Sequence, residues 1–191
     1  MSALERQANL LGAFAGVLTD MTTAEMTAAS GLAASDISAL SALRHFLRKP
    51  TIDQLHQVLG LTPSGAVRLV DRLARHGLVT RGPGADRRER SVTLTARGRR
   101  VADRITAARA SALGGSLADL NPAQRETLHE LISQIMVTVV TAKSGGAWIC
   151  RLCDLRACGR AEGLCPAANA AAAKYLGSQR PAPESGSSPG R

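Results

Sequence analysis

The stretch TIDQLHQVLGLTPSGAVRLVDRLARHG, residues 51–77, constrains the fold more than any other part of the chain. Thr51 and Gln54 have the spacing of a capping box, which begins a helix, and Gly60 stands where that helix is expected to end. After a minimal turn, Thr62 is followed by proline, the preferred combination for the N-cap and first position of a second helix. Two short helices joined so tightly form a helix-turn-helix.

The second helix of this pair has opposite chemistry on its two faces. At 100° per residue, its apolar face contains Ala66, Leu69, Val70 and Leu73. The other face is polar and rich in arginine, with Ser64, Arg68, Asp71, Arg72 and Arg75. An apolar face toward the protein and a cationic face toward solvent are typical of a recognition helix in the DNA major groove.

Individual residues of the cationic face are assigned by their position along the helix. The N-terminal turns of a recognition helix meet the base edges, so Ser64 and Gly65 are predicted to allow close approach of the backbone. Arg68 is the best candidate for a two-hydrogen-bond contact with guanine. Arg72 and Arg75 are interpreted as phosphate contacts or as surface charge.

A change of pattern follows Gly77. The segments LVTR and SVTLT are predicted to be short strands, joined by the glycine-rich and charged loop GPGADRRER. A helix-turn-helix followed by a basic hairpin is a winged helix. The predicted fold class is therefore mainly α with a small β-hairpin wing.

Helices are also predicted on both sides of this unit. Apolar residues recur at helical spacing in residues 4–29, and Ser35 is expected to cap a helix that continues to Pro50. After the wing, Thr95 and Asn121 are predicted to cap two further helices. The stripe of the last helix contains Leu128, Leu131, Ile132, Ile135 and Val139.

The distribution of charge points to an anionic partner. The 191-residue chain has a net charge of +9, and residues 68–109 contain twelve arginines but only four acidic residues. A solvated face is the ordinary interpretation of a charge run, but so uneven a block favours nucleic acid. With only 2% aromatic residues, a base-stacking platform for single strands is disfavoured.

The stretch from the recognition helix through the wing resembles the MarR family of bacterial transcription regulators. The most specific part is the run Asp86, Arg87, Arg88, followed by alternating apolar residues that lead into Leu94, Thr95 and Gly98. The resemblance covers residues 4–142, with residues 51–95 as the DNA-binding lobe, and it implies that the terminal helices form a dimerisation region. Residues 143–175 form a separate Cys-rich segment, and residues 176–191 are predicted to be a disordered tail.

The resemblance implies a homodimer that binds an inverted-repeat operator in double-stranded DNA and is released by a small-molecule effector or by oxidation. In the wing, it implies that Arg88 enters the minor groove while Asp86 holds it, with Arg87 and Arg90 on flanking phosphates. Narrow minor grooves attract arginine by their strong negative potential. It assigns no residue to an effector site, and a non-specific architectural DNA protein is the competing hypothesis.

All four cysteines fall in one short segment, in the pattern C-x2-C-x4-C-x6-C-P: Cys150, Cys153, Cys158 and Cys165. Structural zinc commonly uses two close pairs, and only the first two cysteines form one. The final Cys-Pro is found in iron–sulfur motifs, whose spacing is tighter. Zinc, an iron–sulfur cluster and redox-active or free thiols remain open, and the alternative function is a metal- or redox-sensing regulator. Arg151, Arg156 and Arg160 are expected to offset the thiolate charge.

Other classes of protein are disfavoured by what the sequence contains. No basic stretch leads into an apolar core at the N-terminus, and no apolar run approaches a membrane span, so a cytoplasmic protein without a membrane partner is expected. No catalytic grouping of Ser, His and Asp and no phosphate-binding glycine loop is visible, so an enzyme is not expected. The four histidines have no metal-like spacing.

Overall fold

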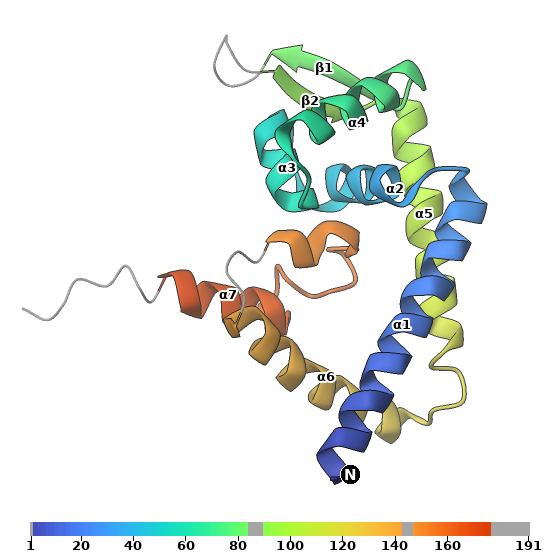
Figure 1. Cartoon of the computed structure of the whole chain (residues 1–191), viewed down its shortest axis with the longest axis vertical. Helices are drawn as coiled ribbons and strands as arrows, with labels where there is room; N and C mark the ends of the chain where they lie inside the picture. The colour runs from blue at the N-terminus through green and yellow to red at the C-terminus, as the bar shows by residue number, and fades with distance from the viewer. Residues whose placement is uncertain (1, 84–89, 143–146, 177–191) are drawn as a thin grey trace, which may run out of the picture.

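The structure is a computed structural model that describes residues 2–83, 90–142 and 147–176. Figure 1 shows a lobe of short helices and a hairpin at one end, with two long helices, labelled α1 and α5, running away from it side by side. Another long helix, labelled α6, crosses below the lobe. The elements are α1 (Ala3–Ser30), α2 (Ala34–Ser41), η1 (Ala42–Phe46), α3 (Ile52–Leu59), α4 (Pro63–Arg75), β1 (Val79–Pro83), β2 (Arg90–Leu94), α5 (Ala96–Gly115), α6 (Pro122–Ala142), η2 (Ala147–Leu152) and α7 (Pro166–Leu176). Within the described part of the chain, no helix is long and apolar enough to cross a membrane.

The predicted helix-turn-helix is present as α3 and α4. The Thr51 hydroxyl accepts a hydrogen bond from the Gln54 amide while the Gln54 side chain accepts one from the Thr51 amide, both at 3.1 Å. Gly60 ends α3 with a φ of 66°, a left-handed conformation that costs glycine little. Thr62 caps α4 by accepting from the Gly65 amide at 3.1 Å. These local bonds satisfy backbone groups at the helix ends, and the predicted capping box, the helix end at Gly60 and the Thr62 cap are confirmed.

One hydrophobic core holds the lobe together and anchors the long α5 to it. Its largest fully buried side chains come from α2, α3, α4, β2 and α5: Ile37, Leu40, Leu55, Leu69, Val70, Leu73, Val92 and Ile105. The predicted apolar face of α4 is therefore the buried one. Its burial leaves the opposite, arginine-bearing face of α4 directed away from the core.

The wing is a two-stranded antiparallel hairpin in the expected place. Val79 pairs with Leu94 and Pro83 with Arg90. The segment before α3 pairs with β2 through one isolated antiparallel β-bridge between Thr51 and Ser91. The Val92 amide also donates to the Pro50 carbonyl at 2.9 Å. The wing is thereby attached to the helix-turn-helix.

The helix predicted to begin at Ser35 begins earlier. Its N-cap is Ala33, which makes no side-chain capping bond, and Ser35 lies within the first turn. The prediction of one helix up to Pro50 is also wrong: α2 gives way at residue 42 to a wider turn in which the Leu47 amide donates to the Ala42 carbonyl at 2.7 Å. This π-helical turn, η1, changes the direction in which His45 and Phe46 point.

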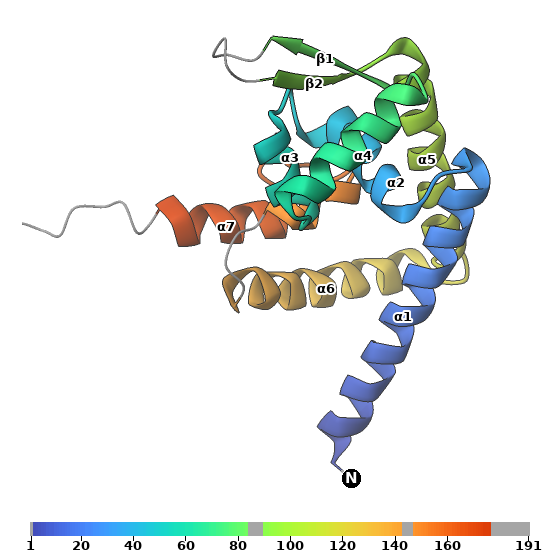
Figure 2. The same ribbon diagram turned by 45° about the horizontal axis from the view of Figure 1, so that its top comes forward.

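The long helices outside the lobe have their predicted caps. Thr95 accepts from the Gly98 amide at 2.9 Å, and the Asn121 side chain accepts from the Gln124 amide at 3.0 Å. α1 packs along α5 (Figures 1 and 2), while α6 packs on α7. Large apolar side chains of α1 and α6 remain exposed on this chain: Leu4, Leu10, Leu11, Phe14, Val17, Leu131, Ile132, Ile135, Val137 and Val139.

Candidate DNA-binding surface and thiol cavity

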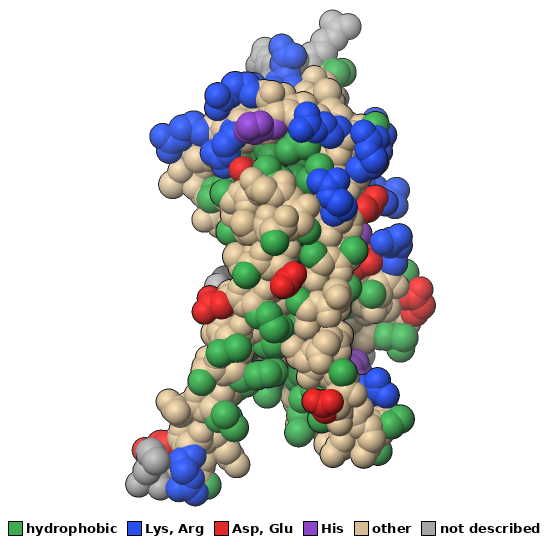
Figure 3. Space-filling model, turned by 90° about the vertical axis from the view of Figure 1, so that its right-hand side faces the viewer, with side chains coloured by type: hydrophobic (Ala, Val, Ile, Leu, Met, Phe, Trp, Pro, Cys, Tyr) green, Lys and Arg blue, Asp and Glu red, His purple; other side chains and the backbone are tan. Residues whose placement is uncertain are grey.

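The exposed face of α4 carries most of the residues assigned to DNA recognition. Ser64, Arg68 and Arg75 are exposed, as is the Thr62 cap, and Gly65 is half-buried. Figure 3 shows Lys and Arg side chains gathered at the lobe end of the molecule, while hydrophobic side chains gather toward the opposite end. The chain therefore has a cationic end and an apolar end.

Arg72 has a different role from the one that the sequence suggested. Its guanidinium binds the carboxylate of Asp36, with the Nη2–Oδ1 distance at 2.6 Å and the Nε–Oδ2 distance at 2.9 Å. The Asp36 side chain is only 5% exposed, against 38% for Arg72. The hydrogen bond to Asp36 raises the pKa of Arg72 above the usual value for arginine. This arginine neutralises a buried acid, so its interpretation as a phosphate contact or plain surface charge is corrected.

The wing contributes one predicted DNA contact that the structure describes. Arg90 is exposed at the start of β2, while Asp86, Arg87 and Arg88 lie outside the described residues. An ion pair that the sequence did not predict joins the wing to the recognition helix. Nη2 of Arg81 in β1 lies 2.6 Å from Oδ1 of Asp71 in α4. The only acid on the polar face of α4 is thus paired with an arginine.

A second arginine cluster lines a cavity of about 990 Å³ between the lobe and the long helices. The α1–α2 turn, α4 and α5 form its walls, and its cationic side chains are Arg72, Arg97, Arg100 and Arg104, with His76 beside them. Arg104 also donates to the Ala29 carbonyl at 3.2 Å, and Arg72 is held by Asp36. Arg97 and Arg100 are exposed and supply positive charge to this cavity.

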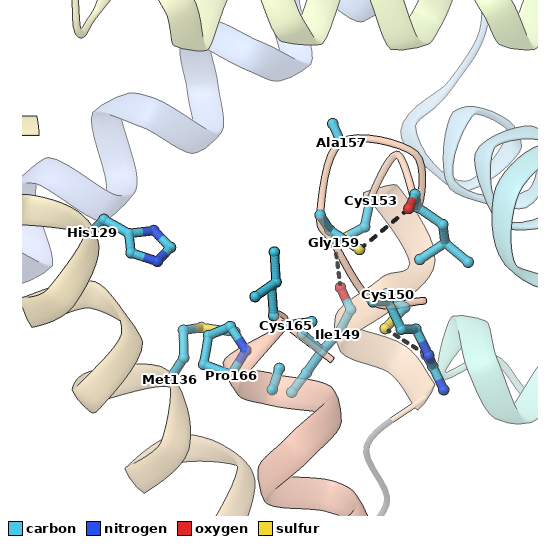
Figure 4. A pocket seen from close by; sticks show the side chains of 14 residues that line it. His129, Met136, Ile149, Cys150, Cys153, Ala157, Gly159, Cys165 and Pro166 are labelled. Atoms are coloured by element: carbon cyan, nitrogen blue, oxygen red, sulfur yellow. Dashed lines mark hydrogen bonds between the residues drawn. The ribbon is translucent and has the colours of Figure 1, made fainter. Parts of the chain in front are cut away.

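All four cysteines line one cavity of about 560 Å³ (Figure 4). Cys150 and Cys153 lie at η2, Cys158 in the turn that follows, and Cys165 directly before α7. Gly159 and Gly163 have φ angles of 60° and 73°, which allow the chain to curl between the last two cysteines. The cysteines that are spread over sixteen residues of sequence are therefore brought around a shared space.

The thiols are not bonded to one another in this structure, and their closest partners are other groups. All four are free; Cys153 Sγ donates to the Ile149 carbonyl at 3.7 Å, and Arg160 Nη1 donates to Cys150 Sγ at 3.6 Å. Burial raises the pKa of both Cys150 and Cys153 above the usual value. Because the thiolate is the reactive form, these two thiols are poor nucleophiles in this state. Among the described residues, no three His, Cys, Asp or Glu side chains converge closely enough to hold a metal ion.

The Cys-rich segment is attached to the underside of the DNA-binding lobe. Asp154 lies 3.3 Å from Nδ1 of His45, whose side chain is only 3% exposed. The other ring nitrogen of His45 lies 2.8 Å from the Thr106 hydroxyl of α5. Burial lowers the pKa of His45 more than the neighbouring Asp154 raises it, so the charged form of the ring is disfavoured at this contact.

Two arginines of the segment have separate partners. The Arg160 guanidinium lies 5.6 Å from the centre of the Phe46 ring, an arrangement that favours a cation–π contact. Arg156 donates to Asp154; burial alone would raise the pKa of Asp154, but the Arg156 hydrogen bonds hold it below the usual value. Arg160 is thus next to a thiol as expected, whereas Arg156 is bound to an acid. Sequence reasoning missed His45 and also Arg109 of α5, which lies beside Cys153.

Comparisons with known proteins agree with this architecture. Residues 30–89 match the model of the MarR family. No curated protein sequence matches the chain. A MarR family protein from Bacillus stearothermophilus superposes with a TM-score of 0.64 at 20% identity, covering 73% of this chain and 98% of its own. RV1404 from Mycobacterium tuberculosis superposes with a TM-score of 0.61 at 23% identity, covering 73% of this chain and 95% of its own.

A third solved structure was obtained with a ligand. Rv2887, a MarR family protein of Mycobacterium tuberculosis in complex with p-aminosalicylic acid, superposes with a TM-score of 0.52 at 25% identity, covering 67% of this chain and 96% of its own. The family match and the shared fold confirm both the predicted resemblance and the predicted fold class. The match of residues 30–89 to the MarR family model supports a DNA-binding transcription regulator.

Proposed function

We propose that this chain, a MarR-family winged helix by its residues 30–89 and by its fold, is a homodimeric regulator that binds an inverted-repeat operator and is released by a small anionic ligand. Members of this family are transcription regulators, not enzymes. The observation that carries the proposal is the exposed cationic face of α4, together with a wing whose second strand begins with the exposed Arg90. A helix and a hairpin of this kind contact the major groove and the adjacent backbone together.

Dimerisation is supported by the apolar surface at the other end of the chain. α1 and α6 expose ten large apolar side chains between them, and soluble monomers rarely leave large apolar patches uncovered. A twofold partner that covers these side chains presents two copies of α4, and two half-sites one helical turn apart are the matching DNA. Sedimentation of the protein–operator complex is expected to give two chains per operator.

Arg68 is the residue on which sequence-specific binding should depend. Arg68→Ala is expected to weaken operator binding by about 1–3 kcal/mol per half-site while weakening binding to unrelated DNA much less. Arg75→Ala is the matched control from the same helix, expected to weaken binding to both DNAs equally and to lower the salt slope by about 1 per half-site. Fluorescence anisotropy on both DNAs measures these affinities.

The salt dependence separates this proposal from weak or incidental binding. For a dimer with about 6–10 phosphate contacts, wild-type affinity should fall by about 10³–10⁵ between 50 and 200 mM salt. An Arg68→Ala loss that is equal on operator and unrelated DNA, with uniform protection in a footprint, would favour the non-specific architectural protein instead.

The arginine-lined cavity is the proposed effector site. It has positive charge from Arg97 and Arg100, and its walls belong both to the recognition helix and to the long helices. An anion bound there contacts α4 and α5 at once, so it can bias their relative position and thereby the spacing of the two recognition helices. Rv2887 was solved with an aromatic carboxylate, p-aminosalicylic acid, which makes this compound a suitable probe.

Removing one positive charge from this cavity should weaken the binding of p-aminosalicylate. Arg100→Gln is expected to reduce p-aminosalicylate affinity by about 5-fold or more, since a hydrogen bond to a charged group is lost. Arg99→Gln is the control. Arg99 is the neighbour of Arg100 in sequence, but it lines a different cavity and donates to the Leu94 carbonyl at 3.0 Å. Isothermal titration calorimetry measures both, and equal affinities for the two variants would place the effector elsewhere.

A further inference from the structure

The four thiols line one shared cavity but do not form a site for a single metal ion among the described residues. A zinc ion with zinc–sulfur bonds of about 2.3 Å requires neighbouring sulfur atoms about 3.8 Å apart. Among the described residues no such group of three ligands around a single ion is found, while all four cysteines line a cavity of about 560 Å³. A cavity of this size has room for a group of several metal atoms, in which each cysteine binds a different one.

The surroundings of the cavity suit a cluster that must be kept from water. Apart from the thiols, the lining is mainly apolar, with Met136 from α6, Ile149 from η2 and Leu164 and Pro166 near α7 (Figure 4). Hydrophobic surroundings and hydrogen bonds to sulfur are the two features by which proteins stabilise iron–sulfur clusters and set their potential. Arg160 already donates to one of the sulfur atoms.

The charges nearby also balance those of a cluster. Four thiolates around an oxidised four-iron core leave a net charge of about −2. Arg160 donates to Cys150 within the cavity, and Arg109 of α5 lies beside Cys153 in a neighbouring cavity, so two positive charges lie next to two of the thiols. In addition, α7 begins immediately after Cys165, with the Asn169 amide bonded to the Cys165 carbonyl at 3.0 Å, so its positive N-terminal end faces the cavity.

We propose that Cys150, Cys153, Cys158 and Cys165 ligate one four-iron, four-sulfur cluster, one cysteine per iron. On binding, the four thiols release four protons to solvent and four iron–sulfur bonds form, with no change in oxidation state required. The cluster replaces the weak bonds that the thiols now make to backbone carbonyls of their own segment.

The position of this site couples it to the DNA-binding lobe. On one side, η2 packs on α2, α3 and η1, with Leu152 against the main core and an Asp154 carboxylate oxygen 3.3 Å from Nδ1 of His45. On the other side, the cavity is lined by His129 and Met136 of α6, and Lys174 of α7 donates to the Thr141 carbonyl of α6 at 2.7 Å. The cluster therefore holds together the lobe and a proposed dimerisation helix. This part of the inference rests on the proposed function.

Metal analysis of the full chain purified without oxygen tests the site directly. A brown protein with a broad visible absorption band and about four iron and four sulfide per chain is expected. A colourless protein with about one zinc per chain, or a protein with neither metal, would overturn the cluster assignment.

Variants with matched controls connect the cluster to these residues. Cys165→Ala should lose most of the bound iron and the visible band, whereas Met136→Leu, at the same cavity but not at a proposed ligand, should keep both. Circular dichroism of Cys165→Ala verifies that the helices remain. Full iron content in Cys165→Ala would exclude this cysteine as a ligand and overturn the four-cysteine site.

The coupling is tested by removing the cluster with a chelator and measuring operator affinity by anisotropy. We expect about a tenfold loss, equal to about 1.4 kcal/mol, and unchanged affinity would overturn the coupling. Failure of the cluster and failure of the proposed function are distinguishable. A protein that binds operator but holds no iron retains the function without the cluster, and a protein that holds iron but ignores all DNA retains the cluster without the function.

Discussion

Arg72→Met is expected to lower the free energy of unfolding by about 3–5 kcal/mol, because it leaves the carboxylate of Asp36 buried without its partner. The Asp36 side chain is 5% exposed and receives hydrogen bonds from both Nε and Nη2 of Arg72. Water cannot replace those bonds at so low an exposure. The converse change, Asp36→Ala, should cost less, since the Arg72 guanidinium is 38% exposed and remains hydrated. Urea unfolding at one protein concentration measures both variants.

Arg75→Met is the matched control for this prediction. Arg75 is exposed one turn further along α4, and the described residues include no ion pair to it. It should change stability by less than about 0.5 kcal/mol while weakening DNA binding. If Arg72→Met and Arg75→Met proved equally stable, the Asp36 pair would have no structural role, and the phosphate interpretation of Arg72 would return.

Gly98→Ala is expected to destabilise the protein by about 3 kcal/mol, the upper part of the usual range for overpacking. A Cβ at this position would lie 1.9 Å from the Leu78 carbonyl oxygen, which is backbone and cannot rotate away. That carbonyl also accepts a hydrogen bond from the Thr95 amide at 3.0 Å, so moving it disturbs the cap of α5 and the base of the wing. The expected fall in melting temperature is about 6–12 °C.

Gly114→Ala provides the same substitution in the same helix without the contact. Nothing lies within 4 Å of a Cβ at Gly114. Alanine favours a helix over glycine by about 1 kcal/mol, so Gly114→Ala should be neutral or stabilising. Equal melting temperatures for the two variants would mean that the backbone at Leu78 adapts, and the close approach would not explain the glycine at residue 98.

The helix boundaries that sequence predicted correctly depend on residues close together in the chain. Thr51 with Gln54, Thr62 with Gly65 and Thr95 with Gly98 each bond across three residues. Such caps can be read from a few letters of sequence. Ser35 failed as a cap because nothing local distinguishes a serine at the N-cap from one in the first turn, and packing of Ile37 and Leu40 in the core determined where α2 begins.

The candidate sites were predicted less completely, because their side chains meet across long stretches of chain. Arg68 and Arg72 lie on the same polar face, and only the distant Asp36 separates an exposed DNA-binding arginine from a structural one. Arg109 and His45 have no motif that links them to the cysteines. They reach the Cys-rich segment because α5 and η1 pass beside it.

The amino-acid sequence by itself determined the helix-turn-helix, the wing, the cationic face of α4 and the grouping of four cysteines. These features follow from periodicity, capping and composition, which act over a few residues. Only the tertiary structure decided that Arg72 serves a buried acid, that the cysteines surround an open cavity, and that this cavity joins α6 to the underside of the lobe. The physical reason is that burial and ion pairing depend on which distant segments pack together, and no local pattern specifies that.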